Sequence, residues 1–178
     1  MNDNRSEPNA TFSLWLCPAQ AAEATLSDTI HRLADELHSE VFAPHITICT
    51  GFSGQVDDLS GTLRKLARDF LPLTVSPQGF SSRNLFFQSL FIQLDLSTTL
   101  QALHDRTGTE FGLRASAGFF PHISLAYQHP ALFDAAGLAE TLDPSLLRDI
   151  HCDRLRLMET SGDIRDWSIR NEIAVDDH

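Results

Sequence analysis

The chain has 178 residues, of which 42% are hydrophobic and 21% are charged, and its formal net charge is −11 at pH 7. This length and apolar content suffice for one compact domain with a buried core, and they argue against an intrinsically disordered chain. Because non-specific binding to a nucleic-acid backbone needs several convergent cations, the negative charge argues against a long nucleic acid as the main ligand. A small phosphorylated ligand is compatible with this composition.

Two further features concern location and cysteine chemistry. The polar N-terminus has no apolar region behind a basic start, and no stretch reaches the length of a transmembrane helix. We therefore expect a cytoplasmic monomer without a membrane partner, built as a single domain over residues 1–178 with a flexible tail at 1–11. The three cysteines are an odd number without Cys-x-x-Cys spacing, so neither a disulfide framework nor a cysteine zinc site is indicated.

The spacing of apolar residues predicts alternating strands and helices in the first half of the chain. Phe12 to Cys17 is an apolar run that stops at Pro18, as is typical of a strand. From about 19 to 40 the apolar residues recur in steps of three and four, which predicts a helix. A buried strand is predicted from His45 to Thr50, and helical spacing returns from Leu59 to Phe70.

The second half of the chain continues with further strands and short helices, which makes the fold class α+β. The predicted strands are Leu73 to Phe80, Leu85 to Leu94, His122 to Tyr127, Ile150 to Met158 and Trp167 to Val175, the last two as an antiparallel pair. The predicted helices run from about Leu100 to Phe111 and from Leu132 to Leu142. No Gly-, Pro- or Ser-rich linker divides the chain, so a two-lobed shape would have to arise within one continuous fold.

Two short segments of the chain resemble each other. Residues 42–48, Phe-Ala-Pro-His-Ile-Thr-Ile, and residues 119–125, Phe-Phe-Pro-His-Ile-Ser-Leu, share Phe, Pro, His and Ile at equal positions. Each segment follows a predicted helix and enters a predicted strand. Similarity of both letters and local context predicts an internal duplication with two related halves.

Each copy places a histidine two residues before a hydroxyl. Because alternate residues of a strand point to the same face, His45 with Thr47 and His122 with Ser124 each present an imidazole beside a hydroxyl. If the two halves face each other, one cleft acquires two imidazoles and two hydroxyls from opposite walls. Core packing gives no reason to repeat a polar pair of this kind, so the duplication favours function over a structural role.

This set of side chains suits the hydrolysis of a phosphate ester. With an ordinary pKa of roughly 6.5, one histidine can be neutral and the other protonated near neutral pH. The neutral imidazole can accept a proton from attacking water while the imidazolium donates one to the leaving oxygen. Thr47 and Ser124 would donate hydrogen bonds to the non-bridging oxygens, where negative charge develops.

A metal site is the other functional interpretation of two histidines. His45 and His122 bring no carboxylate or cysteine at ligand spacing, so we expect neither a metal nor another cofactor. The remaining histidines lie on polar helix faces or near predicted element ends, and we expect them to be solvated.

The sequence resembles the two-histidine phosphoesterase superfamily, and within it the cyclic phosphodiesterase proteins of the plant and yeast type. The resemblance covers nearly the whole chain: it includes residues 13–18 (Ser-Leu-Trp-Leu-Cys-Pro), both histidine motifs, residues 85–91 (Leu-Phe-Phe-Gln-Ser-Leu-Phe), and residues 155–160 followed by Trp167. It implies a bilobal fold similar to the RNA ligase T type, with two pseudo-symmetric, interleaved α+β halves whose antiparallel sheets line a central cleft.

The resemblance also implies an activity and a set of roles. The expected reaction is hydrolysis of ADP-ribose 1″,2″-cyclic phosphate, and of nucleoside 2′,3′-cyclic phosphates, to monoesters. By position, His45 and His122 would be the acid–base pair, with His122 activating water and His45 protonating the leaving oxygen. Thr47 and Ser124 would bind the phosphate, and three aromatic residues would line the cleft around the substrate: Trp15, Phe87 and Tyr127.

For each aromatic residue, burial in the core is the competing interpretation, since aromatic side chains dominate cores as well as binding sites. Two alternative functions stay open at the level of sequence. One is hydrolysis of the 2′,3′-cyclic end of an RNA, which the net charge disfavours. The other is a nucleotide-binding module without turnover, although no role in the expected site is vacant.

Overall fold

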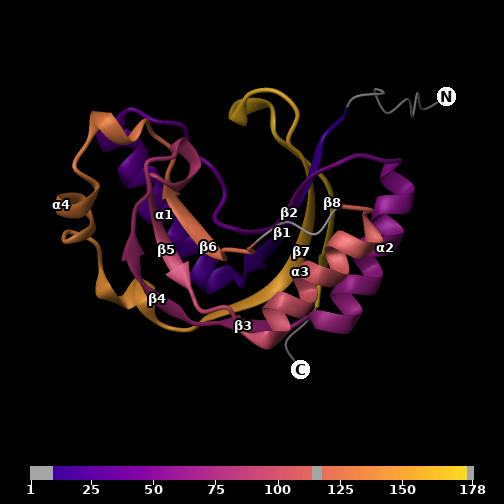
Figure 1. Ribbon diagram of the computed structural model, residues 1–178. Helices are drawn as coiled ribbons and strands as arrows, with labels where there is room; N and C mark the ends of the chain where they lie inside the picture. Colours follow the sequence, from indigo (N-terminus) through magenta and orange to yellow (C-terminus); the bar gives the residue numbers. More distant parts are fainter. Residues whose placement is uncertain (1–9, 114–117, 176–178) are drawn as a thin grey trace.

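The structure, a computed structural model, describes residues 10–113 and 118–175 (Figure 1). Its strands are β1 Phe12–Pro18, β2 Ile46–Phe52, β3 Leu73–Val75, β4 Pro77–Ser81, β5 Leu90–Leu94, β6 His122–Ala126, β7 Ile150–Glu159 and β8 Ser168–Ala174. Its α-helices are α1 Gln20–Leu37, α2 Val56–Phe70, α3 Thr98–Glu110 and α4 Ala135–Ala139, with short 3₁₀ turns at 86–88, 130–132, 144–147 and 164–166.

All eight strands of the described residues belong to one antiparallel sheet. Their order is β3-β7-β1-β2-β6-β5-β4, and β8 pairs with β7. The strands β2 and β6, which carry the two similar segments, are neighbours at the middle of this order. Strand β1 flanks β2 and strand β5 flanks β6, and β7 and β4 follow on the two sides. The sheet therefore has the same arrangement of strands on both sides of its centre.

The two ends of the sheet are close together in the chain. Strand β3 lies at one end of the order and β4 at the other, yet only Ser76 separates them in sequence. This single connecting residue requires the sheet to curl until its edges approach each other. The result is a strongly curved sheet with a concave face, consistent with the cleft that the resemblance implied.

Helices cover the convex face and exchange partners between the two halves. Helix α1 follows β1 but packs against β6 as well as β1, whereas α3 follows β5 but packs against β2. Helix α2 packs against β7, β8 and α3, and α4 packs against β4. In Figure 1, α1 and α4 accordingly lie with β4, β5 and β6, and α2 and α3 lie with β1, β2, β7 and β8. The chain thus interleaves the two lobes.

Strand alternation separates the core from the cleft. Leu14 and Leu16 of β1, Ile46 of β2 and Ile123 of β6 are all 0% exposed and belong to the main core under the helices. Burying one such aliphatic side chain stabilises the fold by about 1.5–3 kcal/mol. The intervening residues of the same strands point to the concave face, as the period of two requires.

The sequence predicted most element boundaries closely, but two predicted strands were wrong in part. The predicted strand from Leu73 to Phe80 is two strands, because Pro77 begins a segment that pairs with β5 while β3 pairs with β7. Only the second half of the predicted strand from Leu85 to Leu94 is extended: Gln88 N donates to Leu85 O and closes a 3₁₀ turn instead. A run of apolar residues does not reveal whether a neighbouring strand is available for pairing.

Two other expectations changed in extent. Within the predicted helix from Leu132 to Leu142, only Ala135–Ala139 is α-helical, where Asp134 caps it by accepting from Gly137 N. The expected tail at 1–11 lies mostly outside the described residues, but Thr11 is held by its amide, which donates to Ser161 Oγ at 2.9 Å. In the described part of the chain, no helix combines the length and hydropathy needed to cross a membrane.

Candidate active site

The two histidine motifs meet at one point of the sheet. Ile46 of β2 pairs with Ile123 of β6 in antiparallel register, and each follows its histidine directly. The neighbouring residues must then oppose each other in the crossed sense, His45 with Ser124 and Thr47 with His122.

Since both isoleucines point into the core, all four polar side chains point to the concave face. They form the corners of a square in which the two histidines occupy one diagonal. Diagonal positions of an antiparallel pair are roughly 7–8 Å apart, which leaves room for a phosphate between them.

Both imidazoles are held by the same local hydrogen bond. His45 Nδ1 lies 2.7 Å from Ala43 O, and His122 Nδ1 lies 2.9 Å from Phe120 O. Because a carbonyl oxygen only accepts, Nδ1 carries the hydrogen in each ring. The free Nε2 atoms are therefore the ones available to exchange protons with a ligand. The two motifs thus share the histidine tautomer as well as the sequence.

Burial distinguishes the two rings. His45 is 6% exposed, and burial lowers its pKa from 6.5 to about 3; the hydrogen bond to Ala43 opposes this shift, and the charges of His122 and then Arg156 add to it. His122 is partly exposed, and burial followed by the positive charge of Arg83 lowers its pKa as well. In the ligand-free protein both rings are neutral at pH 7, and His45 is the harder one to protonate.

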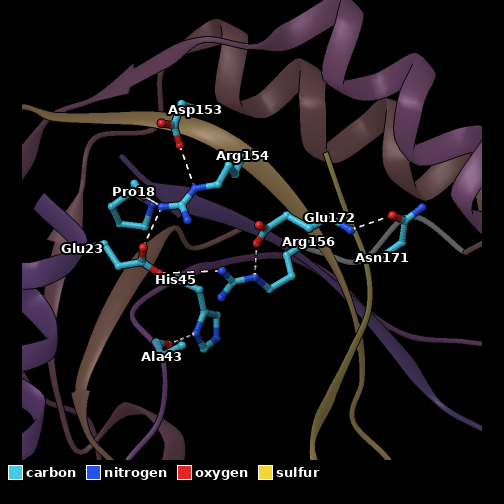
Figure 2. Close-up of polar contacts among 9 residues, drawn as sticks. All are labelled: Pro18, Glu23, Ala43, His45, Asp153, Arg154, Arg156, Asn171 and Glu172. Carbon is cyan, nitrogen blue, oxygen red and sulfur yellow. Dashed lines mark hydrogen bonds and ion pairs between the residues drawn. The ribbon is translucent and has the colours of Figure 1, made fainter. Parts of the chain in front are cut away.

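The ring of His45 is also fixed by packing. Trp15 of β1 stacks on it with ring centroids 3.5 Å apart and planes inclined by 7°. Arg156 lies opposite Trp15 in the register of β1 and β7, and its Nε donates to Glu172 at 2.6 Å. Figure 2 shows this partly buried ion-pair network above His45, with Glu23 between Arg154 and Arg156. The network joins β7 to β8 and α1, and Arg154 also donates to Pro18 O at the end of β1, the strand that carries Trp15.

A cleft of about 440 Å³ opens over the square of polar side chains. All seven residues that the sequence nominated for the site line it: Trp15, His45, Thr47, Phe87, His122, Ser124 and Tyr127. Among the described residues that line it there is no Asp, Glu, Lys or Arg. A bound phosphate would therefore meet histidines, hydroxyls, aromatic rings and the amide of Gln88.

One end of the cleft is aromatic. Tyr127, 4% exposed, stacks on Phe42 with centroids 3.7 Å apart and meets Phe87 edge-on at 5.0 Å. Phe87 is 49% exposed, and its ring lies nearly parallel to Trp167 at 6.1 Å. Trp167 was not among the nominated residues, although the resemblance included it. Its position between the 3₁₀ turn at 164–166 and β8 gave no separate signal.

The hydroxyls of the square differ in their contacts. Ser124 Oγ donates to Phe87 O at 2.8 Å and also interacts with Tyr127, whose own pKa is raised by burial. Thr47 makes no side-chain hydrogen bond with another residue in 10–113 or 118–175. Thr47 is therefore ready to bind a ligand oxygen, whereas the hydrogen of Ser124 must first turn away from a carbonyl.

The sequence missed the polar residues at the opposite end of the cleft. Ser13, Thr50 and Thr160 line it there, together with Thr11 and the backbone of Gly162. Ser13 shares its strand face with Trp15, so alternation could have found it. Thr50 is three residues from Thr47, so regular alternation would place the two side chains on opposite faces of the sheet. A break in the β1–β2 register between Leu14 and Trp15 brings Thr50 to the same face.

Two observations concern the other histidines and metal ligands. The expectation that the remaining histidines are solvated was wrong for His104, which is partly buried. Its Nδ1 lies 2.7 Å from Ile48 O, and its ring stacks on Phe119 at 4.2 Å because α3 packs against β2. Within the described ranges, no three His, Cys, Asp or Glu side chains come together in a way that could hold a metal ion.

Solved structures with the same fold support this description of the architecture. A crystal structure of a phosphoesterase matches with a TM-score of 0.61 at 14% identity, covering 94% of this chain and 99% of that chain. E. coli LigT complexed with phosphate matches at 0.58 with 17% identity, and LigT complexed with 3′-AMP at 0.59 with 13% identity. These cover 96% and 93% of this chain and 99% and 98% of the LigT chains.

The curved sheet with its paired histidine strands thus has the two-histidine phosphoesterase fold. The chain belongs to the cyclic phosphodiesterase-like protein family, whose model matches residues 10–175. This confirms both the superfamily and the enzyme class that the sequence predicted. Among curated proteins, none matches the sequence significantly.

Proposed function

We propose that this protein hydrolyses a small cyclic phosphate to a phosphomonoester, with a nucleoside 2′,3′-cyclic phosphate or ADP-ribose 1″,2″-cyclic phosphate as substrate, and that it does so without a metal. The observation that carries the proposal is the square of two imidazoles and two hydroxyls around the Ile46–Ile123 pair. Each of the four groups has a role in an in-line displacement at phosphorus, and the reaction needs no additional group.

In this mechanism water attacks phosphorus opposite the ring oxygen that leaves. One imidazole Nε2 accepts a proton from the water, the bond between phosphorus and the ring oxygen breaks, and the second imidazole donates its proton to that oxygen. Thr47 and Ser124 donate to the non-bridging oxygens as their charge increases. At the end of the reaction one ring has gained a proton from water and the other has lost one to the leaving oxygen. After the product leaves, the two rings return to their starting states by proton exchange with solvent.

One histidine becomes protonated only when the substrate binds. Both pKa values are low in the empty cleft, and the lining offers no other cation. A phosphate anion between the rings favours protonation, because an opposite charge within a few ångströms raises the pKa of an imidazole. The partly exposed His122 acquires this proton at lower cost than the buried His45.

Burial therefore favours an assignment opposite to the one that resemblance implies: His45 accepts the proton of water and His122 donates to the leaving oxygen. A cyclic phosphorothiolate with sulfur at the leaving position tests this, since a thiolate leaves without an acid. We expect the sulfur substrate to restore most of the activity of His122→Ala and little of that of His45→Ala. Rescue of His45→Ala alone would reverse the assignment.

The aromatic end of the cleft supports a nucleotide as the group attached to the phosphate. Stacking of a base on an aromatic ring contributes about 1–3 kcal/mol. Phe87 and Trp167 present nearly parallel rings at the rim, and Tyr127 and Trp15 lie deeper. LigT, which shares the fold, is known in complexes with phosphate and 3′-AMP. Both ligands are compatible with a phosphate-binding square beside an aromatic wall.

A substrate panel tests the proposal. Purified protein is treated with a chelator and assayed on ADP-ribose 1″,2″-cyclic phosphate, the four nucleoside 2′,3′-cyclic phosphates and a short RNA with a cyclic end. We expect turnover of at least one small substrate, unchanged by the chelator. Preference for the RNA, weakened by salt, would indicate the RNA-end alternative. Tight binding without any product would indicate a binding module instead.

A further inference from the structure

The end of the cleft opposite the aromatic wall contains a connected row of hydroxyls. Ser13 Oγ lies 2.7 Å from Thr50 Oγ1 and 3.0 Å from Thr160 Oγ1. Thr160 Oγ1 in turn donates to Thr11 O at 3.4 Å. Ser13 is 3% exposed, whereas Thr50 is exposed and Thr160 is partly exposed, so the row faces the cleft on both sides of a buried centre.

The row can both donate to and accept from a ligand. Thr160 Oγ1 donates to Thr11 O, but in the Ser13–Thr50 and Ser13–Thr160 bonds either hydroxyl can be the donor. The exposed end, Thr50 Oγ1, can therefore exchange hydrogen bonds with a group that is itself both donor and acceptor, such as a sugar hydroxyl.

A register irregularity of the sheet aims Thr50 into the cleft. Leu14 pairs with Cys49, but Trp15 pairs with Thr47, so β2 holds one extra residue between these positions. Such a bulge changes which side of the strand the following side chains occupy. Cys49 is thereby turned into the core and Thr50 toward Ser13.

The hydroxyl row lies at a defined distance from the phosphate position. The register of β2 and β6 orders the cleft from Thr50, past Thr47 and His122, then His45 and Ser124, to Tyr127. Because of the bulge, Thr50 lies opposite Ser13, which is two residues of β1 from Trp15 opposite Thr47, so the row begins roughly 7 Å along the sheet from Thr47. A base stacked at the aromatic end of a bound cyclic nucleotide leaves its 5′ side directed toward the hydroxyl row.

We propose that the row formed by Thr50, Ser13 and Thr160 is a second subsite, which binds the hydroxyls of a non-reacting sugar joined to the reacting ring through its 5′ position. The inference rests on the proposed cyclic phosphodiesterase function. The hydroxyl lining of this end supports a sugar, whose hydroxyls can both donate to and accept from it. Two substrate types carry such a sugar: a pyrophosphate-linked ADP-ribose derivative and an RNA end.

The test compares substrates with and without those hydroxyls. The first pair is a dinucleotide ending in a 2′,3′-cyclic phosphate whose 5′ sugar is ribose or 2′-deoxyribose. The second pair is ADP-ribose 1″,2″-cyclic phosphate and its derivative with 2′,3′-dideoxyadenosine. One hydrogen bond contributes about 0.5–1.5 kcal/mol, so we expect kcat/KM to favour the hydroxylated member of a pair by about two- to tenfold.

Three variants make the test specific. Thr50→Val should lower kcat/KM for the hydroxylated member of a pair to that of the deoxy member, and Thr50→Ser should retain the preference. Thr25→Val on the exposed face of α1 is the matched control and should behave as the wild type. The pair that responds to Thr50→Val identifies which substrate type the subsite accepts.

The outcomes separate the subsite from the function. Absence of preference in both pairs, or an equal effect of Thr50→Val on hydroxylated and deoxy substrates, would overturn the subsite while cyclic phosphate turnover continued. If the wild type hydrolysed no cyclic phosphate at all, the proposed function itself would fail.

Discussion

At the scale of single residues, His45 combines deep burial with a planar stack on Trp15. The fold therefore holds the imidazole neutral and fixes its orientation before a substrate arrives. A group that is preorganised in this way loses little entropy when it reacts. The cost is borne by stability, because an unfolded chain can protonate the same histidine freely.

This cost gives His45 a predicted effect on acid stability. Its pKa is about 3 in the folded protein and near 6.5 when unfolded, so the unfolded state binds more protons at any pH between these values. Stability is then lost as the pH falls below about 6.5. We expect the free energy of unfolding of the wild type to drop by roughly 1.4 kcal/mol per pH unit more than that of His45→Gln.

Urea denaturation of both proteins between about pH 6 and pH 4 measures this difference. His31→Gln, at an exposed position of α1, serves as the control and should keep the slope of the wild type. Parallel curves for the wild type and His45→Gln would show that His45 is protonated as easily in the folded protein as in the unfolded chain.

At the scale of elements, the pairing of β2 with β6 assembles the site. Ile46 and Ile123 form a backbone pair between these strands, and both side chains are fully buried. The same pair thus joins the two lobes and sets the relative position of both histidines. A small change of packing below the sheet should then appear in the chemistry above it.

The variant Ile46→Val tests this link. Removing one methylene group from a core isoleucine costs about 0.5–1.5 kcal/mol. We expect that loss of stability together with a reduced kcat at unchanged KM, because the histidines shift relative to each other while the aromatic wall stays in place. The matched change Ile30→Val, in a fully buried position of α1, should cost similar stability without changing kcat. If Ile46→Val and Ile30→Val had the same kcat, the pairing of β2 with β6 would not influence catalysis.

The elements also show what the sequence could and could not predict. The helices and most strands were visible in their periodicity, and the repeated motif led to His45 and His122 because a duplicated polar pair has no packing explanation. Alternation failed at Thr50, where a bulge reverses the direction of the side chains. The split at Pro77 depended on which distant strands were free to pair. Both are tertiary properties that local spacing does not contain.

At the scale of the whole molecule, the interleaved lobes make the site a property of the complete fold. Helix α1 supports β6 and α3 supports β2, so each histidine strand rests on a helix that follows a strand of the other lobe. The cleft between them is uncharged although the molecule has a net charge of −11. This combination suits a small anion that is bound by hydrogen bonds and one transferable proton more than a long polyanion.

The central claim is that the two histidines act together on one phosphate. The most direct measurement is the kcat of His45→Ala and His122→Ala on the best small cyclic phosphate, with a chelator present and circular dichroism to verify folding. General acid–base groups each contribute about 10²–10⁴-fold, so we predict that each single variant loses at least about a hundredfold and the double variant loses far less than the product of the two. Near-normal turnover in either folded single variant would contradict the account.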